Sequence, residues 1–331
     1  MKRSVILLLV ALVGLGHPGP AFAYLKFGFR MADRTIDVRW PAGPIRYFVN
    51  DRDIPGVSAG DFRSAIARAA ATWQAVPGIS LAFEDQGMTA APPGGLDGRN
   101  TLGFLDRPDL DRVLGATSLL LDSATGALVE ADVFLNTRFQ WSVSPQGAAG
   151  LVDVESIVLH ELGHLIGLGH SAIGETERTA SGGRRVLGSG AVMFPIALTP
   201  GATSDRVLQA DDIAAVTDLY GVDPARASTG SIRGRVVKNG RGVFGAHVVA
   251  FNPVTGTIIG GFTLSADGEF VLAGLQAGPH VVRVEPLDDA DVESFLSGEV
   301  DVDFGVAYAP RLVVAPRGGS SGAIEIPVDP K

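Results

Sequence analysis

The segment 160–170 constrains this chain more than any other, because it places three of the six histidines and a glutamate in one short stretch. Residues four apart lie one above the other on a helix, roughly 6 Å apart along its axis, so His160 and His164 can direct two imidazole nitrogens at one metal ion. Glu161 leaves the helix beside that ion, where a carboxylate can accept a proton from an attacking water. Gly167 can adopt a left-handed conformation cheaply, which ends the helix and brings His170 in as a third ligand.

Three protein nitrogens leave the fourth tetrahedral position open, which is the arrangement of a catalytic zinc site rather than a structural one. A His-Glu-x-x-His match alone can occur by chance on an ordinary helix, but here the glycine and the third histidine also fall at the required offsets. Apolar residues of the segment supply a face that can bury the helix: Val158, Leu162, Leu165 and Ile166. The pattern therefore predicts one catalytic zinc ion, with Glu161 as the general base.

This pattern resembles the metzincin metallopeptidases. The stretch Ala191-Val192-Met193-Phe194-Pro195 is similar to their Met-turn, in which the methionine lies beneath the metal; the alternative is an ordinary core methionine. Ser171 directly after the third histidine, and Pro195 two residues after Met193, are similar to the matrixin branch. The segment that begins at Asp211 and Asp212 resembles the matrixin C-terminal helix, and these aspartates can also act as a helix N-cap. The resemblance covers roughly residues 38–222 and implies a zinc-dependent endopeptidase.

Departures from the matrixin pattern limit what the resemblance implies. The chain has no cysteine, so we do not expect a latency mechanism that depends on a propeptide cysteine. The other histidines are His17, His247 and His280, which do not supply a second, structural zinc site, and we expect the last two to have structural roles. The polar, glycine-rich segment 174–190 is either a mobile flap near the cleft or an inert surface insertion, because long loops are of both kinds.

The resemblance also implies how a substrate binds. Peptidases of this shape hold the peptide as an extra strand on a sheet edge, here expected at Leu114, Gly115 and Ala116. The wall of the main specificity pocket is expected from residues 194–205, with Leu162 and His160 at its base. Three acidic residues have the chemistry of calcium ligands, although surface carboxylates explain them equally well and we assign no calcium site: Asp122, Glu130 and Asp132.

The start of the chain predicts export. A basic start, an apolar run and the small-x-small sequence Ala21-Phe22-Ala23 indicate that residues 1–23 are a signal peptide, so the mature protein begins at Tyr24. The apolar run is too short for a comfortable transmembrane span. The formal net charge of −9 falls by two to −11 when Lys2 and Arg3 leave with the leader, and no basic cluster offsets it. Nucleic acid and anionic membranes are therefore not expected partners.

Length and pattern predict two domains of the α+β and all-β classes. The first, residues 24–222, has the twisted mixed sheet and three main helices of a metzincin by resemblance. Its expected elements include a helix over 58–76 capped by Ser58 and Asp61, a strand over 127–136, and the active-site helix over 154–168 capped by Asp153. A linker follows at 223–230.

After the linker, short β-branched runs separated by turn pairs such as Asn239-Gly240 and Asp267-Gly268 predict a small β-sandwich over residues 231–331. Its glycine layout resembles the carboxypeptidase regulatory-like, or transthyretin-like, domain. Such a domain either attaches the enzyme to a surface or polymer or only stabilises it. We expect a monomer. Two other functions stay open: an exported binding or adhesion protein with a vestigial peptidase domain, and a processing protease dedicated to one partner.

Overall fold

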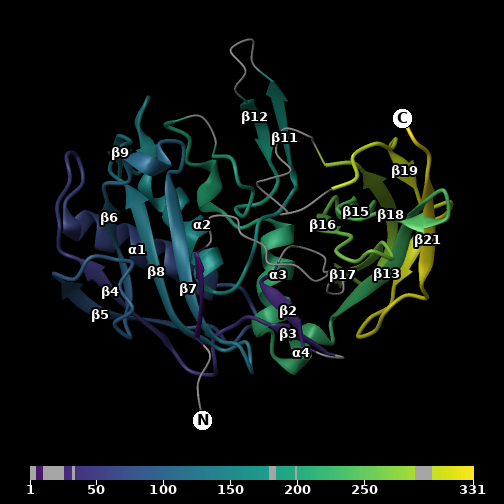
Figure 1. The fold of residues 1–331 in the computed structure, drawn as a ribbon, viewed down its shortest axis with the longest axis horizontal. Helices are drawn as coiled ribbons and strands as arrows, with labels where there is room; N and C mark the ends of the chain where they lie inside the picture. Colours follow the sequence, from purple (N-terminus) through teal and green to yellow (C-terminus); the bar gives the residue numbers. More distant parts are fainter. Residues whose placement is uncertain (1–4, 10–25, 32–33, 179–183, 198–199, 288–299) are drawn as a thin grey trace.

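The computed structural model describes residues 5–9, 26–31, 34–178, 184–197, 200–287 and 300–331. Figure 1 shows two lobes side by side, with the N-terminal sheet and its helices on the left and the C-terminal strands on the right. Helix α3 (Ala210–Tyr220) lies between them. None of the described helices is both long and apolar enough to cross a membrane.

The N-terminal lobe is built on a six-stranded mixed sheet with the order β1-β7-β8-β6-β4-β5. Strands β4, β5, β6 and β8 run parallel, whereas β7 is antiparallel to β8 and to β1. Strand β1 pairs with residues 118–122 of β7. On the same edge of β7, the side away from β8, residues 115–117 pair with no described strand. The strands are β1 (Val5–Leu9), β4 (Ile45–Asn50), β5 (Phe83–Thr89), β6 (Asn100–Leu105), β7 (Gly115–Asp122) and β8 (Leu128–Asn136).

Two long helices of this lobe begin where the sequence predicts. Helix α1 (Ala59–Gln74) is capped by Ser58, whose side chain accepts from the Asp61 backbone N–H at 3.1 Å. Helix α2 (Val154–Leu165) is capped by Asp153, which accepts from the Ser156 N–H at 2.9 Å. The predicted end of α2 at residue 168 is too late, because the backbone leaves the helix before Gly167, whose φ is +100°.

The shorter elements of this lobe surround the sheet. They are β2 (Gly28–Met31), β3 (Arg34–Asp37), η1 (Pro108–Leu110), β9 (Trp141–Ser142), β10 (Val152–Asp153) and η2 (Ser204–Arg206). The segment 174–190, expected to be either a mobile flap or an inert surface insertion, contains an antiparallel hairpin of β11 (Gly174–Arg178) and β12 (Arg184–Ser189), with its tip outside the described residues. Backbone hydrogen bonds make such a ladder, so a polar composition does not prevent it.

The predicted linker 223–230 is more regular than expected. It contains the short helix α4 (Asp223–Arg226), which has a proline in its first turn, and the start of β13 (Thr229–Lys238). Proline is favoured there because its fixed φ suits a helix and its missing N–H has no partner to lose. The chain therefore enters the C-terminal lobe through ordered structure.

The C-terminal lobe consists of two small sheets. One has the order β14-β13-β17 with β21 beside β13, and the other has the order β16-β15-β18-β19 with β20 beside β18. Asn239 and Gly240 both have positive φ in the two-residue turn between β13 and β14, as an Asn-Gly hairpin requires. The two all-β sheets agree with the predicted class, while the carboxypeptidase regulatory-like assignment stays a prediction. The strands are β14 (Arg241–Gly242), β15 (His247–Phe251), β16 (Ile258–Phe262), β17 (Glu269–Gln276), β18 (Gly278–Glu285), β19 (Ala307–Tyr308), β20 (Val313–Ala315) and β21 (Ile324–Val328).

One hydrophobic cluster runs through both lobes, from Trp73 and Leu162 to Phe270 and Val282. Helix α3 makes the connection: a Cβ on Gly274 of β17 would lie 2.6 Å from the Cβ of Ala214. That approach is too close for any side chain at position 274, so the backbone of β17 rests directly on the helix. The two lobes therefore share a packed interface.

Candidate metal centre

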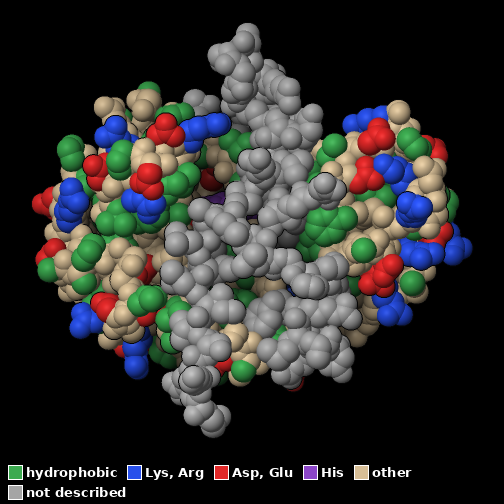
Figure 2. Space-filling view, viewed as in Figure 1, with side chains coloured by type: hydrophobic (Ala, Val, Ile, Leu, Met, Phe, Trp, Pro, Cys, Tyr) green, Lys and Arg blue, Asp and Glu red, His purple; other side chains and the backbone are tan. Residues whose placement is uncertain are grey.

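The three histidines of the motif converge at one point. Helix α2 supplies His160 and His164, whose Nε2 atoms are 3.1 Å apart, and the turn at Gly167 brings the Nε2 of His170 to 3.2 Å from that of His164. They are the only cluster of metal-ligating side chains found in the described part of the chain. Figure 2 shows histidine atoms reaching the surface on the inner side of the left-hand lobe.

Hydrogen bonds fix the protonation of two of these rings. The Nδ1–H of His160 donates to the Val192 carbonyl at 2.7 Å, and that of His164 donates to the Leu168 carbonyl at 2.8 Å. A carbonyl oxygen can only accept, so the proton of each neutral ring is on Nδ1 and a lone pair is on Nε2. Burial lowers the pKa of both histidines, and the other histidines lower that of His164 further, which favours these neutral forms.

Two lone pairs that face each other at 3.1 Å repel unless a cation lies between them. Nitrogen ligands about 2.0–2.1 Å from a tetrahedral zinc ion are about 3.3 Å apart, close to the observed spacing. Backbone carbonyls that accept from the second ring nitrogen are the usual support of a metal-binding histidine. The donor set therefore fits zinc.

The predicted general base, Glu161, directly follows His160 on α2. Glu161 is buried, and its Oε2 accepts from the Thr117 hydroxyl of β7 at 2.7 Å. Burial raises the pKa of Glu161 to about 7, while the hydrogen bond from Thr117 opposes that rise. A carboxylate with a pKa near neutrality can take up and release a proton during one catalytic cycle. The sequence did not identify Thr117 as a partner of Glu161, because the contact joins distant segments.

The Met-turn lies directly under helix α2. Met193 is buried, and a Cβ on Gly163 would lie 2.2 Å from its Sδ atom. Any larger residue at position 163 would displace the methionine, so the glycine inside the histidine motif has a packing role that its spacing did not reveal. The Met193 carbonyl accepts from the Ser171 N–H at 2.8 Å, and Pro195 ends the turn two residues later.

Asp212 holds the Met-turn against α3. Its carboxylate accepts from the backbone N–H groups of Val192 at 2.8 Å, Met193 at 3.1 Å and Gln209 at 2.8 Å. The last bond is half of a capping box at the start of α3, so one side chain caps the helix and fixes the turn. The expected N-cap role is therefore corrected: Gln209 is the N-cap of α3, and Asp212 is the N3 residue of its capping box. Asp211, the preceding residue, accepts from the Ser171 hydroxyl at 2.6 Å.

The end of the expected wall of the specificity pocket, residues 194–205, lies near the start of α2, through the short helix η2, although 198–199 are outside the described residues. Arg206 fixes its end: the guanidinium donates to the Asp153 carboxylate at 2.9 Å and to the carbonyls of Ser144 and Pro145 at 2.8 and 3.1 Å. Leu162 is fully buried, whereas His160 is half-buried. Arg206 was not singled out from the sequence, because its partners lie far away along the chain.

The acidic residues considered for calcium bind backbone N–H groups instead. Asp132 accepts from Gly94 and Thr101, both at 2.6 Å. Glu130 accepts from Gly98 at 2.7 Å, and Asp122 accepts from Ala124 at 2.8 Å. These contacts explain the carboxylates as anchors of the loops around β8 without a metal ion.

The other histidines lie apart from the metal centre. His247 in β15 contacts Glu285 through Nδ1 at 3.0 Å, and the Nδ1 of His280 in β18 donates to the Gly278 carbonyl at 3.0 Å. Both are in the C-terminal lobe, in agreement with their expected structural roles. His17 lies outside the described residues.

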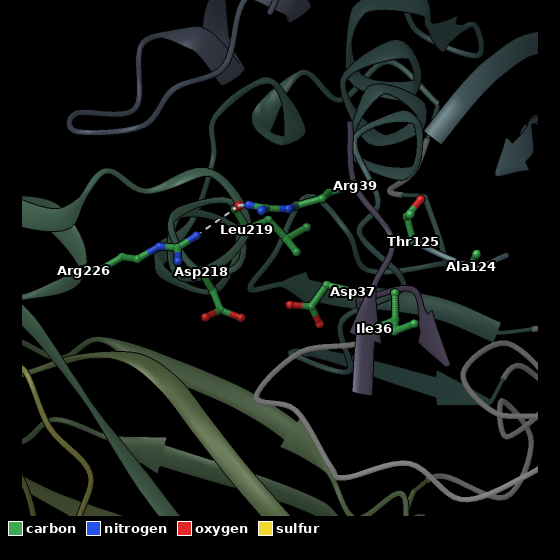
Figure 3. A pocket seen from close by; sticks show the side chains of 8 residues that line it. All are labelled: Ile36, Asp37, Arg39, Ala124, Thr125, Asp218, Leu219 and Arg226. Carbon is green, nitrogen blue, oxygen red and sulfur yellow. Dashed lines mark hydrogen bonds between the residues drawn. The ribbon is translucent and has the colours of Figure 1, made fainter. Parts of the chain in front are cut away.

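A pocket of about 470 Å³ lies elsewhere, near the end of α3 (Figure 3). Arg39 and Arg226 both donate to the Leu219 carbonyl, at 3.0 and 3.2 Å, which places two cations at the negative end of the helix. Asp37 and Asp218 both pair with Lys26, at 3.2 and 2.6 Å. The charged groups that line the pocket are already paired with Lys26 or with the end of α3, so we assign the pocket to the anchoring of this helix and not to a ligand.

Comparison with known proteins agrees with this geometry. The matrixin family model matches residues 39–176. Metalloendoproteinase 4-MMP of Arabidopsis thaliana is 28% identical over 181 residues, which cover 54% of this chain and 45% of that protein. For Metalloendoproteinase 2-MMP of the same plant the identity is 26% over 174 residues, or 50% of this chain and 38% of the relative. Metalloendoproteinase 5-MMP is 36% identical over 81 residues, or 24% and 18%.

The chain thus spans less than half of the length of these relatives. A solved structure, the Bacillus anthracis TIE protein, aligns at 14% identity and a TM-score of 0.21 over 31% of this chain and 17% of its own, which is too little to inform the fold. The family match ends before the Met-turn, but it includes all three histidines and Glu161. The matrixin prediction is confirmed for the catalytic domain: residues 39–176 match the matrixin family model, and the relatives found are metalloendoproteinases.

Proposed function

We propose that this protein is an exported zinc endopeptidase that hydrolyses peptide bonds in protein substrates. The observation that carries the proposal is the convergence of the three histidines, with the Nε2 of His164 3.1 and 3.2 Å from those of His160 and His170, together with the buried carboxyl of Glu161, the residue that follows His160 on α2. A vestigial domain that only binds a partner has no need to keep both the metal ligands and the base. The leader-like residues 1–23 support export.

His160, His164 and His170 would hold the metal, and bound zinc would polarise the scissile carbonyl and lower the pKa of a water to about 7. Glu161 accepts the proton of the attacking water at a carboxylate oxygen and then donates it to the leaving nitrogen. The hydroxyl of Thr117 orients the Glu161 carboxyl group for this proton transfer, because it donates a hydrogen bond to Oε2. The peptide bond is cleaved with no covalent link to the protein.

Substrate would bind along β7. On the side away from β8, residues 115–117 pair with no described strand, and residues 118–122 pair with β1, which lies within the proposed leader. Thr117 of the same strand contacts Glu161. A peptide added there as an extra strand gains main-chain hydrogen bonds and runs next to the general base. Position 115 also favours a small residue, because a Cβ there would lie 3.1 Å from the Oε1 atom of Glu161.

Digestion of casein and gelatin by the purified protein tests the proposal. We expect cleavage that a zinc chelator abolishes and added zinc restores. The matched control is Glu161→Gln, which keeps the shape of the side chain and should bind zinc while cleaving about 10²–10⁴-fold more slowly. Turnover by this variant equal to that of the parent would contradict the assigned base, and a zinc-loaded parent that cleaves neither protein would favour a single dedicated substrate or a binding role. Secreted material that begins at Tyr24 would support export.

A further inference from the structure

The C-terminal lobe packs against the segments that complete the metal centre. Ile173, three residues after His170, forms a small buried cluster with Ala191, the first residue of the Met-turn stretch, and with Val249 of β15. A Cβ on Gly260 of β16 would lie 2.5 Å from the Cδ1 of Ile173. The backbone of β16 therefore touches the chain that carries the third histidine.

One buried carboxylate spans this interface. Asp211, at the start of α3, is 2% exposed. Its Oδ1 accepts from the backbone N–H of Gly260 at 2.9 Å, and its Oδ2 accepts from the hydroxyl of Ser171 at 2.6 Å. Strand β16 is at the edge of its sheet, so an outward-facing N–H at this position would otherwise lack a partner. Asp211 satisfies it and at the same time holds the residue next to His170.

Ser171 transmits this contact to the metal centre. Its N–H donates to the Met193 carbonyl at 2.8 Å, and its hydroxyl oxygen also accepts from the Ile173 N–H at 3.1 Å. The hydroxyl is therefore fixed from both sides, and the backbone that follows His170 has little freedom. Residues that orient ligands in this indirect way usually change metal affinity when they are replaced.

We propose that Asp211 is a positioning residue that couples the C-terminal lobe to the third zinc ligand, so that β16 is part of the support of the metal centre. This role goes beyond attachment or general stabilisation, and it rests on the proposed function only in assigning zinc to the three histidines. The two lobes then act as one unit, because a displacement of β16 would move Asp211 and Ser171 and so change the position of His170.

Zinc affinity, measured on the full chain by competition with a chelator, tests the coupling. In Asp211→Asn one of the two donors loses its acceptor, and we expect about a tenfold to hundredfold loss of zinc affinity. The matched control is Asp218→Asn on the same helix, where the carboxylate pairs with Lys26 and zinc affinity should be unchanged. The melting temperature is recorded with and without zinc, because a purely structural role would lower both values equally and leave zinc affinity at the parental level.

A second pair of variants acts from the C-terminal side. Gly260→Ala should push β16 away from Ile173 and reduce zinc affinity, although it is in the other lobe. Gly305→Ala, in open space, is its control. Parental zinc affinity in both Asp211→Asn and Gly260→Ala would overturn the inference. If Asp211→Asn does not fold, Ser171→Ala decides, because it removes only the hydroxyl link: reduced zinc affinity supports the coupling and parental affinity refutes it.

These measurements separate the inference from the proposed function. A parent that binds zinc but cleaves no protein would refute the endopeptidase proposal while the affinities of the variants still decide the coupling. A parent that binds zinc and cleaves, with variants of unchanged affinity, would refute the coupling alone. A parent that takes up no zinc would refute both.

Discussion

The two sides of the metal centre are held in different ways. His160 and His164 lie four residues apart on α2, so the helix alone fixes their relation. His170 follows the helix and depends on the turn at Gly167 and on contacts with segments far along the chain, among them Asp211 and Asp212. The first side is specified by local sequence and the second by tertiary structure, so they should respond differently to substitution.

The largest effect is expected on the local side. His164→Ala removes the ligand whose Nε2 lies within 3.2 Å of both other rings, so the variant should neither retain zinc nor cleave protein. Metal analysis of the purified variant and digestion of casein check this. Zinc retained at the parental level by a folded His164→Ala protein would contradict a single zinc site formed by the three histidines.

On the tertiary side, Asp212→Ala should destabilise the fold more than it changes any single ligand. The N–H groups of Val192, Met193 and Gln209 lose their acceptor, and buried donors without partners should cost about 3 kcal/mol or more in total. Urea unfolding of the metal-free protein measures the loss, with Asp218→Ala as the partly exposed control on the same helix. Equal losses in the two variants would show that the Met-turn does not depend on Asp212.

A smaller effect concerns pH and the general base in the metal-free protein. The pKa of Glu161 is raised to about 7 in the fold, against about 4.3 in the unfolded chain. Its stabilising contribution is therefore complete below about pH 4 and is lost as the pH rises through 7. Glu161→Gln lacks this titration, so the melting temperature of the variant minus that of the parent should increase from pH 5 to pH 8. A difference that stays constant over this range would contradict the burial argument.

The smallest effect is expected from Thr117→Val, which keeps the shape of the side chain but removes its hydroxyl. The hydrogen bond from Thr117 lowers the pKa of Glu161, so its loss should raise that pKa. The acid limb of the pH profile of kcat/KM should then move to higher pH while zinc affinity stays the same. A shift toward lower pH would reverse the assigned role of this hydroxyl.

The sequence predicted the local side of the centre well, for physical reasons. The spacing of His160 and His164, the glycine at 167 and the caps at Ser58 and Asp153 all act within one or two helical turns, and the structure confirms the caps and the convergence of the histidines. Helix α2 is shorter than predicted, because the apolar pattern continues past the turn at Gly167. Periodicity alone does not mark where the backbone leaves the helix.

The contacts of the tertiary side could not be predicted in the same way. Thr117 reaches Glu161, Gly163 faces Met193 and Gly260 donates to Asp211 across distances of tens of residues, and no local pattern links these pairs. Hairpin β11–β12 was missed because its strands have a polar, glycine-rich sequence whose pairing depends on the backbone. The C-terminal strands were predicted from their turns, but turn chemistry does not show that β16 would face the metal-binding segment.

X-ray absorption at the zinc edge of the purified, zinc-loaded protein tests the central claim most directly. We predict one zinc ion per chain with three imidazole nitrogens at about 2.0–2.1 Å and one oxygen donor in the fourth position. A protein that takes up no zinc, or a zinc ion with fewer than three imidazole ligands, would contradict the account.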